Sequence, residues 1–146
     1  MPRTPLSIVL GLDALIAISF GVASGFWPLA TFGTIVRLQP PEQHTATIAA
    51  LTTVSLFYVL MGLVSLATLL LPRAAQPWFV LILCLRHLLS FVKGLMEAGA
   101  GWQIGSPVPD LVIHSVFGLA YLLCFIQLVR SEALYSRWYG SPRRIE

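Results

Sequence analysis

Charged side chains are scarce in this chain. Only 10% of its 146 residues are Asp, Glu, Lys or Arg, whereas 57% are hydrophobic. A soluble globular domain carries roughly 25% charged residues, so this chain lacks the polar side chains that a water-facing surface needs. The formal net charge is only +3 and gives no indication of a nucleic-acid partner. The composition therefore excludes an ordinary soluble domain and points to the lipid bilayer as the surroundings.

Cysteine is also nearly missing. Cys84 and Cys124 both lie inside apolar stretches, and the sequence has no CxxC pair. Membrane thiol oxidoreductases need paired reactive cysteines near a surface, so this class is excluded. We expect both cysteines to act as small apolar core residues. The sequence contains no internal repeat and no low-complexity tract.

Long apolar stretches are what the chain does contain. They cover residues 6–27, 48–71, 78–97 and 111–129. A membrane-spanning helix needs about 20 predominantly apolar residues, and each stretch comes close to that length. The sequence predicts an all-α, polytopic membrane protein with four transmembrane helices in an antiparallel bundle. Residues 1–146 would form one domain, ending in a short basic cytoplasmic tail at residues 130–146.

The arginines predict the orientation in the membrane. If both termini and the second loop share one compartment, only Arg37 lies on the opposite side. The positive-inside rule then places both termini in the cytoplasm. All four tryptophans lie near the ends of spans, as in the aromatic belts of membrane proteins. The arginines on the cytoplasmic side are Arg3, Arg73, Arg130, Arg137, Arg143 and Arg144.

The two loops on the opposite side are long enough to cover one end of the bundle. The first, residues 28–47, contains an apolar segment at residues 29–38 that could form a short helix in the membrane interface. The third, residues 99–109, is rich in glycine and proline. A GxxxG pattern, Gly21 to Gly25, lies in the first span and predicts close helix packing within the bundle.

Seven ionisable residues lie within or at the edges of these spans. Such residues are costly in hydrocarbon, so they tend to pair with one another and to mark functional sites. They are therefore the candidates for this protein's chemistry: Asp13, Arg86, His87, Lys93, Glu97, Asp110 and His114.

Helical spacing divides these residues into faces. On the third span, Arg86, Lys93 and Glu97 lie on one stripe, and on the fourth, Asp110 and His114 share another. Two polar stripes on consecutive antiparallel helices should face each other. Because the rise is about 1.5 Å per residue, we expect Glu97 to lie level with Asp110, and Lys93 level with His114.

These four residues form the predicted catalytic group. His114 is the candidate general acid–base, because a carboxylate four residues away, Asp110, can orient its ring and raise its basicity. Lys93 would stabilise negative charge on a substrate oxygen, with Glu97 beside it. Simpler alternatives remain open: Asp110 could be a helix N-cap, Lys93 could extend to the surface, and Glu97 could lie in the interface.

The remaining ionisable residues suggest structure rather than chemistry. Asp13 and Arg86 lie at comparable depths and are predicted to form a structural ion pair between the first and third spans. His87 points away from Arg86 and has no assigned role. A haem held by His87 and His114 is disfavoured because their expected depths differ by roughly 10 Å. We predict no metal and no cofactor, since no set of ligand spacings repeats on two helices.

Three functions fit these observations. The first is a small integral membrane enzyme or binding protein for a lipophilic small molecule. It would use acid–base residues for isomerase-, cyclase- or hydrolase-type chemistry in a pocket near the non-cytoplasmic face. The second is a non-catalytic accessory subunit of a larger membrane complex. The third is a small transporter, which would need a homodimer because four helices are few for an alternating-access pathway.

Overall fold

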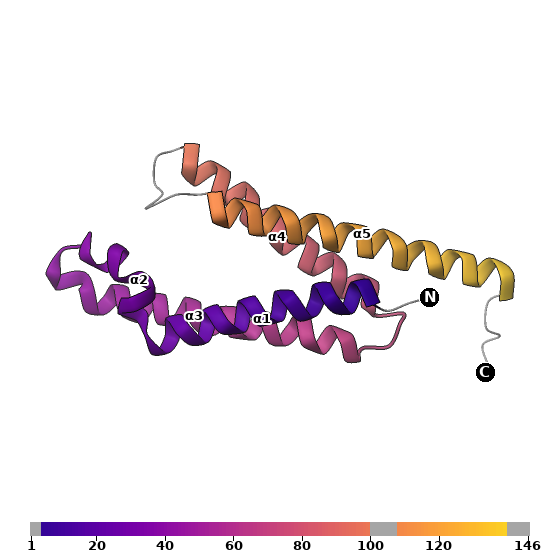
Figure 1. Ribbon diagram of the computed structural model, residues 1–146, viewed down its shortest axis with the longest axis horizontal. Helices are drawn as coiled ribbons and strands as arrows, with labels where there is room; N and C mark the ends of the chain where they lie inside the picture. Colours follow the sequence, from indigo (N-terminus) through magenta and orange to yellow (C-terminus); the bar gives the residue numbers. More distant parts are fainter. Residues whose placement is uncertain (1–3, 100–107, 140–146) are drawn as a thin grey trace.

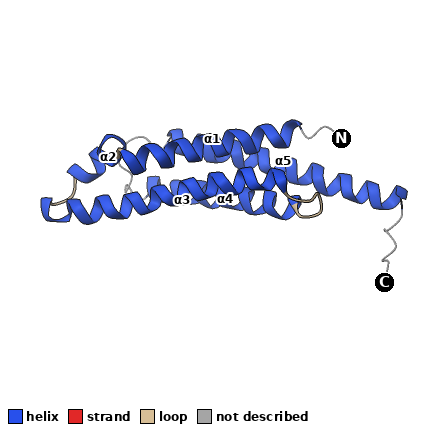
Figure 2. Ribbon diagram, turned by 90° about the horizontal axis from the view of Figure 1, so that it is seen from below, coloured by secondary structure: helices blue, strands red, loops and turns tan. Residues whose placement is uncertain are grey.

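The computed structural model describes residues 4–99 and 108–139, and over these residues the chain forms helices and short connections (Figures 1 and 2). The all-α prediction is confirmed. The elements are α1 (Thr4–Phe26), α2 (Pro28–Arg37), the 3-10 helix η1 (Pro41–Gln43), α3 (His44–Leu70), α4 (Gln76–Gly99) and α5 (Val108–Tyr139).

Four of these helices are long and apolar enough to cross a membrane. The candidate spans are Pro5–Phe26, Pro41–Leu70, Gln76–Gly99 and Val108–Ser131, and each overlaps one predicted stretch. They identify the chain as a multi-pass integral membrane protein. Its orientation in the bilayer stays a prediction, and Arg3, Arg143 and Arg144, on which that prediction partly depends, lie outside the described residues.

The spans pair into two helical hairpins, α1 with α3 and α4 with α5 (Figure 1). Fewer contacts join the hairpins, and these run from α1 to α5 and from α3 to α4. The four spans therefore surround a common interior, with α1 diagonally opposite α4. The hairpins cross at an angle, closer together near the start of α1 than at the end that carries α2 (Figure 1).

Glycines allow α1 and α3 to approach closely. A Cβ atom on Gly21 would lie 2.7 Å from the Ser55 carbonyl oxygen and from Val59 Cγ2. A Cβ atom on Gly62 would lie 2.5 Å from Ile18 Cγ1. Without a hydrophobic driving force between helices in lipid, such small residues permit the backbone contact that holds a pair together.

The buried apolar core lies toward the end where the hairpins converge. It includes Leu10, Val80, Leu83 and Tyr121 and also contains both cysteines. Most other large apolar side chains point outward, as expected for helices that face lipid. The core therefore closes one end of the interior, and the polar side chains described next lie beside it.

The short helix predicted within residues 29–38 is present as α2, which packs against α1 and α3. Its Phe32 ring lies 6.0 Å from Phe20 on α1, and Phe20 contacts Tyr58 on α3 edge-to-face at 4.9 Å. These ring contacts pack α2 against the end of the bundle where the hairpins separate.

Candidate functional site

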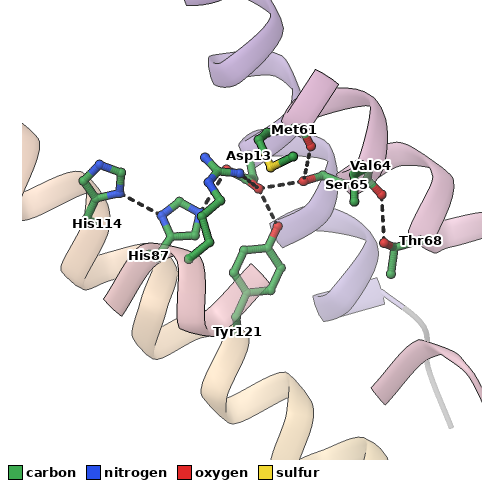
Figure 3. Close-up of polar contacts among 9 residues, drawn as sticks. Asp13, Met61, Val64, Ser65, Thr68, His87, His114 and Tyr121 are labelled. Carbon is green, nitrogen blue, oxygen red and sulfur yellow. Dashed lines mark hydrogen bonds and ion pairs between the residues drawn. The ribbon is translucent and has the colours of Figure 1, made fainter. Parts of the chain in front are cut away.

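Asp13 is the centre of a buried polar cluster in which all four spans meet (Figure 3). Its Oδ2 accepts hydrogen bonds from Ser65 Oγ on α3 at 2.7 Å and from the Tyr121 hydroxyl on α5 at 2.8 Å. Its Oδ1 lies 3.1 Å from His87 Nε2 on α4. A carboxylate in an apolar interior needs such donors, and here three different helices supply them.

Arg86 supplies charge to this cluster without a hydrogen bond. Its Nη1 lies 3.6 Å from Asp13 Oδ2, within ion-pair distance, and the side chain is 18% exposed. The same nitrogen is buried and has no hydrogen-bond partner among the described residues. Ser65 and Tyr121 already occupy the nearer Asp13 oxygen. Asp13 and Arg86 therefore lie together as expected, while the purely structural role of the pair stays a prediction.

A chain of polar contacts continues from Asp13 toward the surface. His87 Nδ1 lies 2.9 Å from His114 Nδ1 (Figure 3), and His114 Nε2 lies 3.3 Å from Asp110 Oδ1. His87 is 1% exposed and stacks on Phe117, so it is sealed within the interior. Asp110 is 56% exposed. The four side chains thus connect the buried carboxylate to an accessible one through two imidazole rings.

Two neutral imidazoles satisfy the hydrogen bonds of this chain. His87 donates from Nε2 to Asp13, so its Nδ1 accepts the proton that His114 carries on Nδ1. The Nε2 atom of His114 then carries no proton and lies within ion-pair distance of Asp110. An additional proton on this nitrogen would make the contact with Asp110 attractive, and Arg86 balances the charge of Asp13.

A cavity of about 300 Å³ lies between the hairpins beside this chain. This volume is at the lower end of the range for small-molecule sites. Of the seven ionisable residues singled out in the sequence, four line the cavity, and Tyr58 adds a hydroxyl. The polar part of its wall consists of Asp13, Tyr58, Arg86, Asp110 and His114.

The remaining wall is apolar and reaches the outer surface of the bundle. Ile16 and Phe20 on α1 are 43% and 38% exposed, and Ile113 on α5 is 39% exposed. These side chains line the cavity and also face outward within the spans, so the cavity wall continues into the outer apolar surface of α1 and α5. Phe117 forms part of its inner wall.

Lys93 and Glu97 lie outside the cavity wall. Lys93 Nζ contacts Glu97 Oε1 at 2.6 Å, and the lysine side chain is 71% exposed. The expected contact along their own helix is therefore present. Their catalytic roles remain predictions from the sequence, since the structure places neither of them beside His114 in the cavity.

The register of α4 against α5 differs from the expected one by about two residues, or roughly 3 Å along the helices. A Cβ atom on Gly94 would lie 2.9 Å from Leu111 Cδ2, and one on Gly118 would lie 3.7 Å from His87 Cβ. The rings of His87 and His114 are in contact, although we expected their depths to differ by about 10 Å, because both side chains reach across the interior.

Asp110 is not the N-cap of its helix. The helix α5 begins at Val108, so Asp110 lies in the first turn. A carboxylate there is favoured by the positive end of the helix dipole and remains free to contact His114 one turn later. Asp110 therefore does not cap α5, and its position in the first turn permits the ion pair with His114.

Two members of the cluster were missed as site residues. Tyr121 lies seven residues after His114 and so on the same helix face, which was a usable signal. No signal in the sequence pointed to Ser65, because a single hydroxyl in an apolar helix usually bonds its own backbone. Ser65 also does so, with the Met61 carbonyl. His87 was noticed but had no assigned role, and it is the link between Asp13 and His114.

Among the described residues no group of three or more histidine, cysteine, aspartate or glutamate side chains could hold a metal ion. The ionisable side chains here follow one another in a line rather than converging on a point. Comparisons with protein-family models, with curated proteins and with solved structures give no match to this chain. Its function is therefore argued from the site alone.

Proposed function

We propose that this chain is a small integral membrane enzyme that binds a lipophilic small molecule in the cavity and transfers a proton on it. The observation that carries the proposal is the chain of contacts from Asp110 through His114 and His87 to Asp13. It ends in a cavity wall, where His114 Nε2 lies 3.3 Å from Asp110 Oδ1 and is open to accept a proton from the bound molecule. A proton acceptor and a neighbouring carboxylate are thus present together, as acid–base catalysis requires.

His114 is the group that exchanges a proton with the bound molecule. Its Nδ1 is engaged by His87, so Nε2 is the nitrogen available for exchange. Asp110 orients the ring and, being more exposed, connects it with the surroundings. His87 holds the opposite edge of the ring and passes charge changes to Asp13. Histidine suits this task because it accepts and donates protons near neutral pH.

Isomerase-type chemistry fits this arrangement best. An isomerisation removes a proton from one atom of the substrate and returns a proton to another, so it needs no cofactor and no net supply of protons. Cyclisation or hydrolysis would begin with the same protonation by His114. Positioned acid–base groups contribute roughly 10²- to 10⁴-fold to the rate of such steps.

The direction of entry follows from the cavity and the proposed orientation. If both termini are cytoplasmic, as the arginines indicate, then the first turn of α5 and the cavity beside it lie toward the non-cytoplasmic face. The mouth bordered by Ile16, Phe20 and Ile113 then faces the hydrocarbon of the bilayer. A lipophilic substrate would enter sideways from the membrane without crossing water.

The test uses His114→Gln, which keeps the size and polarity of the side chain but cannot act as an acid–base group. Purified protein in nanodiscs is incubated with the lipid extract of cells that express it, and products are followed by mass spectrometry. We expect turnover to fall by about 10²-fold or more. His44→Gln is the matched control, because His44 bonds the Gln39 carbonyl oxygen outside the cavity.

Two results would contradict the proposal. One is equal conversion of the same molecules by wild type and His114→Gln. The other is a folded wild-type protein that leaves the whole extract unchanged. A loss of turnover in His44→Gln as large as that in His114→Gln would show a general effect on folding and would remove the support for His114.

A further inference from the structure

We propose that the cavity binds an uncharged, mainly apolar molecule whose polar end is an oxygen acceptor, such as a carbonyl, and that the Arg86 guanidinium donates a hydrogen bond to this oxygen. The inference rests on the proposed function, because it concerns the same cavity. It adds the chemical class of the ligand, and it gives Arg86 a role in binding beyond its ion pair with Asp13.

The first observation is that Arg86 has a hydrogen-bond donor without a partner among the described residues. Nη1 is buried without a hydrogen-bond partner among the described residues, and the Arg86 side chain, which is 18% exposed, lines the cavity. A rotation of the guanidinium would turn this donor toward the cavity. Asp13 cannot readily satisfy it, since Ser65 and Tyr121 lie within 2.8 Å of the oxygen that faces Arg86 at 3.6 Å. A buried donor left unpaired is costly, and arginine carries donors only. Its missing partner is therefore an acceptor.

The charges around the cavity favour an uncharged acceptor. Asp13 is paired with Arg86, and Asp110 adds a second carboxylate to the same wall. An anionic ligand would bring a further negative charge beside these two carboxylates. A cationic group would offer no acceptor to Arg86, which carries donors only. A neutral oxygen satisfies Arg86 and adds no charge to the site.

The shape of the cavity supports the apolar remainder of the ligand. Phe20, Ile16 and Ile113 line it and face outward in the spans, so the ligand's tail leaves along an apolar surface. Its volume of about 300 Å³ accommodates a small head group rather than a large ring system. The polar end then lies against Arg86, next to His114 in the same wall. The oxygen held by Arg86 would be the one whose charge changes during proton transfer.

The experiment compares four unbranched C11 compounds that differ only at one end. A photoreactive 2-undecanone with a diazirine in its tail is crosslinked to the protein in nanodiscs. Unlabelled 2-undecanone, undecane, undecanoate and undecylamine compete with it. We expect 2-undecanone to compete best. Arg86→Met should weaken this binding by about 10- to 100-fold, the usual effect of losing a hydrogen bond to a charged group. Arg130→Met, at an exposed position on α5, should leave it unchanged.

A second measurement needs no variant at Arg86. The carbonyl stretch of ¹³C-labelled 2-undecanone bound to the wild-type protein should appear at lower frequency than in empty nanodiscs, because the oxygen accepts a charged hydrogen bond. An unshifted stretch overturns the inference even if Arg86→Met fails to fold. Ile113→Trp, which fills the mouth and keeps the polar cluster, should block crosslinking of the probe.

The outcomes separate this inference from the proposed function. Equal competition by undecane, or better competition by undecanoate or undecylamine, overturns the uncharged acceptor while the lipophilic cavity and its acid–base chemistry stand. Crosslinking that Ile113→Trp does not reduce shows that the probe binds elsewhere. This result overturns the present inference, while the acid–base function is tested separately by His114→Gln.

Discussion

We expect Asp13→Asn to lower the free energy of unfolding by about 3–5 kcal/mol, the usual cost of removing one partner of a buried ion pair. The substitution keeps the shape of the side chain and removes its charge. It leaves the Arg86 guanidinium, 3.6 Å away, without its counterion. A Coulomb energy of about 4–5 kcal/mol follows at that distance with an effective dielectric constant near 20. Because Arg86 is 18% exposed, solvent screening makes this figure an upper limit.

Hydrogen bonding adds to the cost of Asp13→Asn. The carboxylate accepts from His87 on one oxygen and from Ser65 and Tyr121 on the other. An asparagine has to turn its NH₂ group toward one of these sides, where it meets a donor. A buried donor that loses its acceptor costs about 1–3 kcal/mol. The estimate of 3–5 kcal/mol therefore does not depend on the ion pair alone.

A double-mutant cycle with Arg86→Met isolates the ion pair. Once Arg86 is gone, Asp13→Asn no longer strands a cation, so the double variant should be more stable than the summed single effects by about 2 kcal/mol. Unfolding in mixed micelles of increasing SDS content, followed by tryptophan fluorescence, measures all four proteins. Additivity within about 0.5 kcal/mol would refute the reasoning. The matched control is the exposed pair of Lys93 and Glu97, whose Lys93→Met and Glu97→Gln cycle should give a coupling below about 1 kcal/mol.

Two further predictions concern packing and protonation. Gly21→Ala should destabilise the protein by about 1–3 kcal/mol, because the new methyl group would meet Val59 on the facing helix, and the SDS titration should show it. Gly11→Ala, with nothing within 4 Å of its Cβ, should be neutral or stabilising by up to about 1 kcal/mol, and a similar loss for both would refute the packing argument. NMR of ¹⁵N-histidine-labelled protein should detect a scalar coupling between the Nδ1 atoms of His87 and His114 across one shared proton. The absence of that coupling in folded protein would contradict the hydrogen bond between the two rings.

The fold was largely predictable because the bilayer imposes a simple rule. A span needs an apolar stretch of fixed length, so composition alone located α1, α3, α4 and α5. The short helix α2 was also expected, from an apolar segment ended by two prolines. The helix ends were less predictable. The helix α5, for example, starts at Val108, before the expected span, and continues to Tyr139.

Most residues of the site could be predicted from the sequence, but not which of them contact one another. The cost of charge in hydrocarbon identified Asp13, Arg86, His87, Asp110 and His114 as candidates. Their partners depend on the register and rotation of four helices, and a shift of about two residues changes which side chains meet. Lys93, expected level with His114, contacts Glu97 and is 71% exposed. The contact between His87 and His114 was not expected.

The cluster around Asp13 also has a consequence for biosynthesis. Asp13 belongs to the first span to be made, but the hydroxyl of Tyr121 that bonds it is 108 residues further along the chain. When only α1 and α3 have been synthesised, Ser65 is the available member of the cluster, and the carboxylate lies in the membrane without a countercharge. The first hairpin is therefore left incomplete until the second arrives, since Arg86, His87 and Tyr121 all belong to α4 and α5. A substitution in the last helix should thus be able to expose the first one to the quality control of the membrane-insertion machinery.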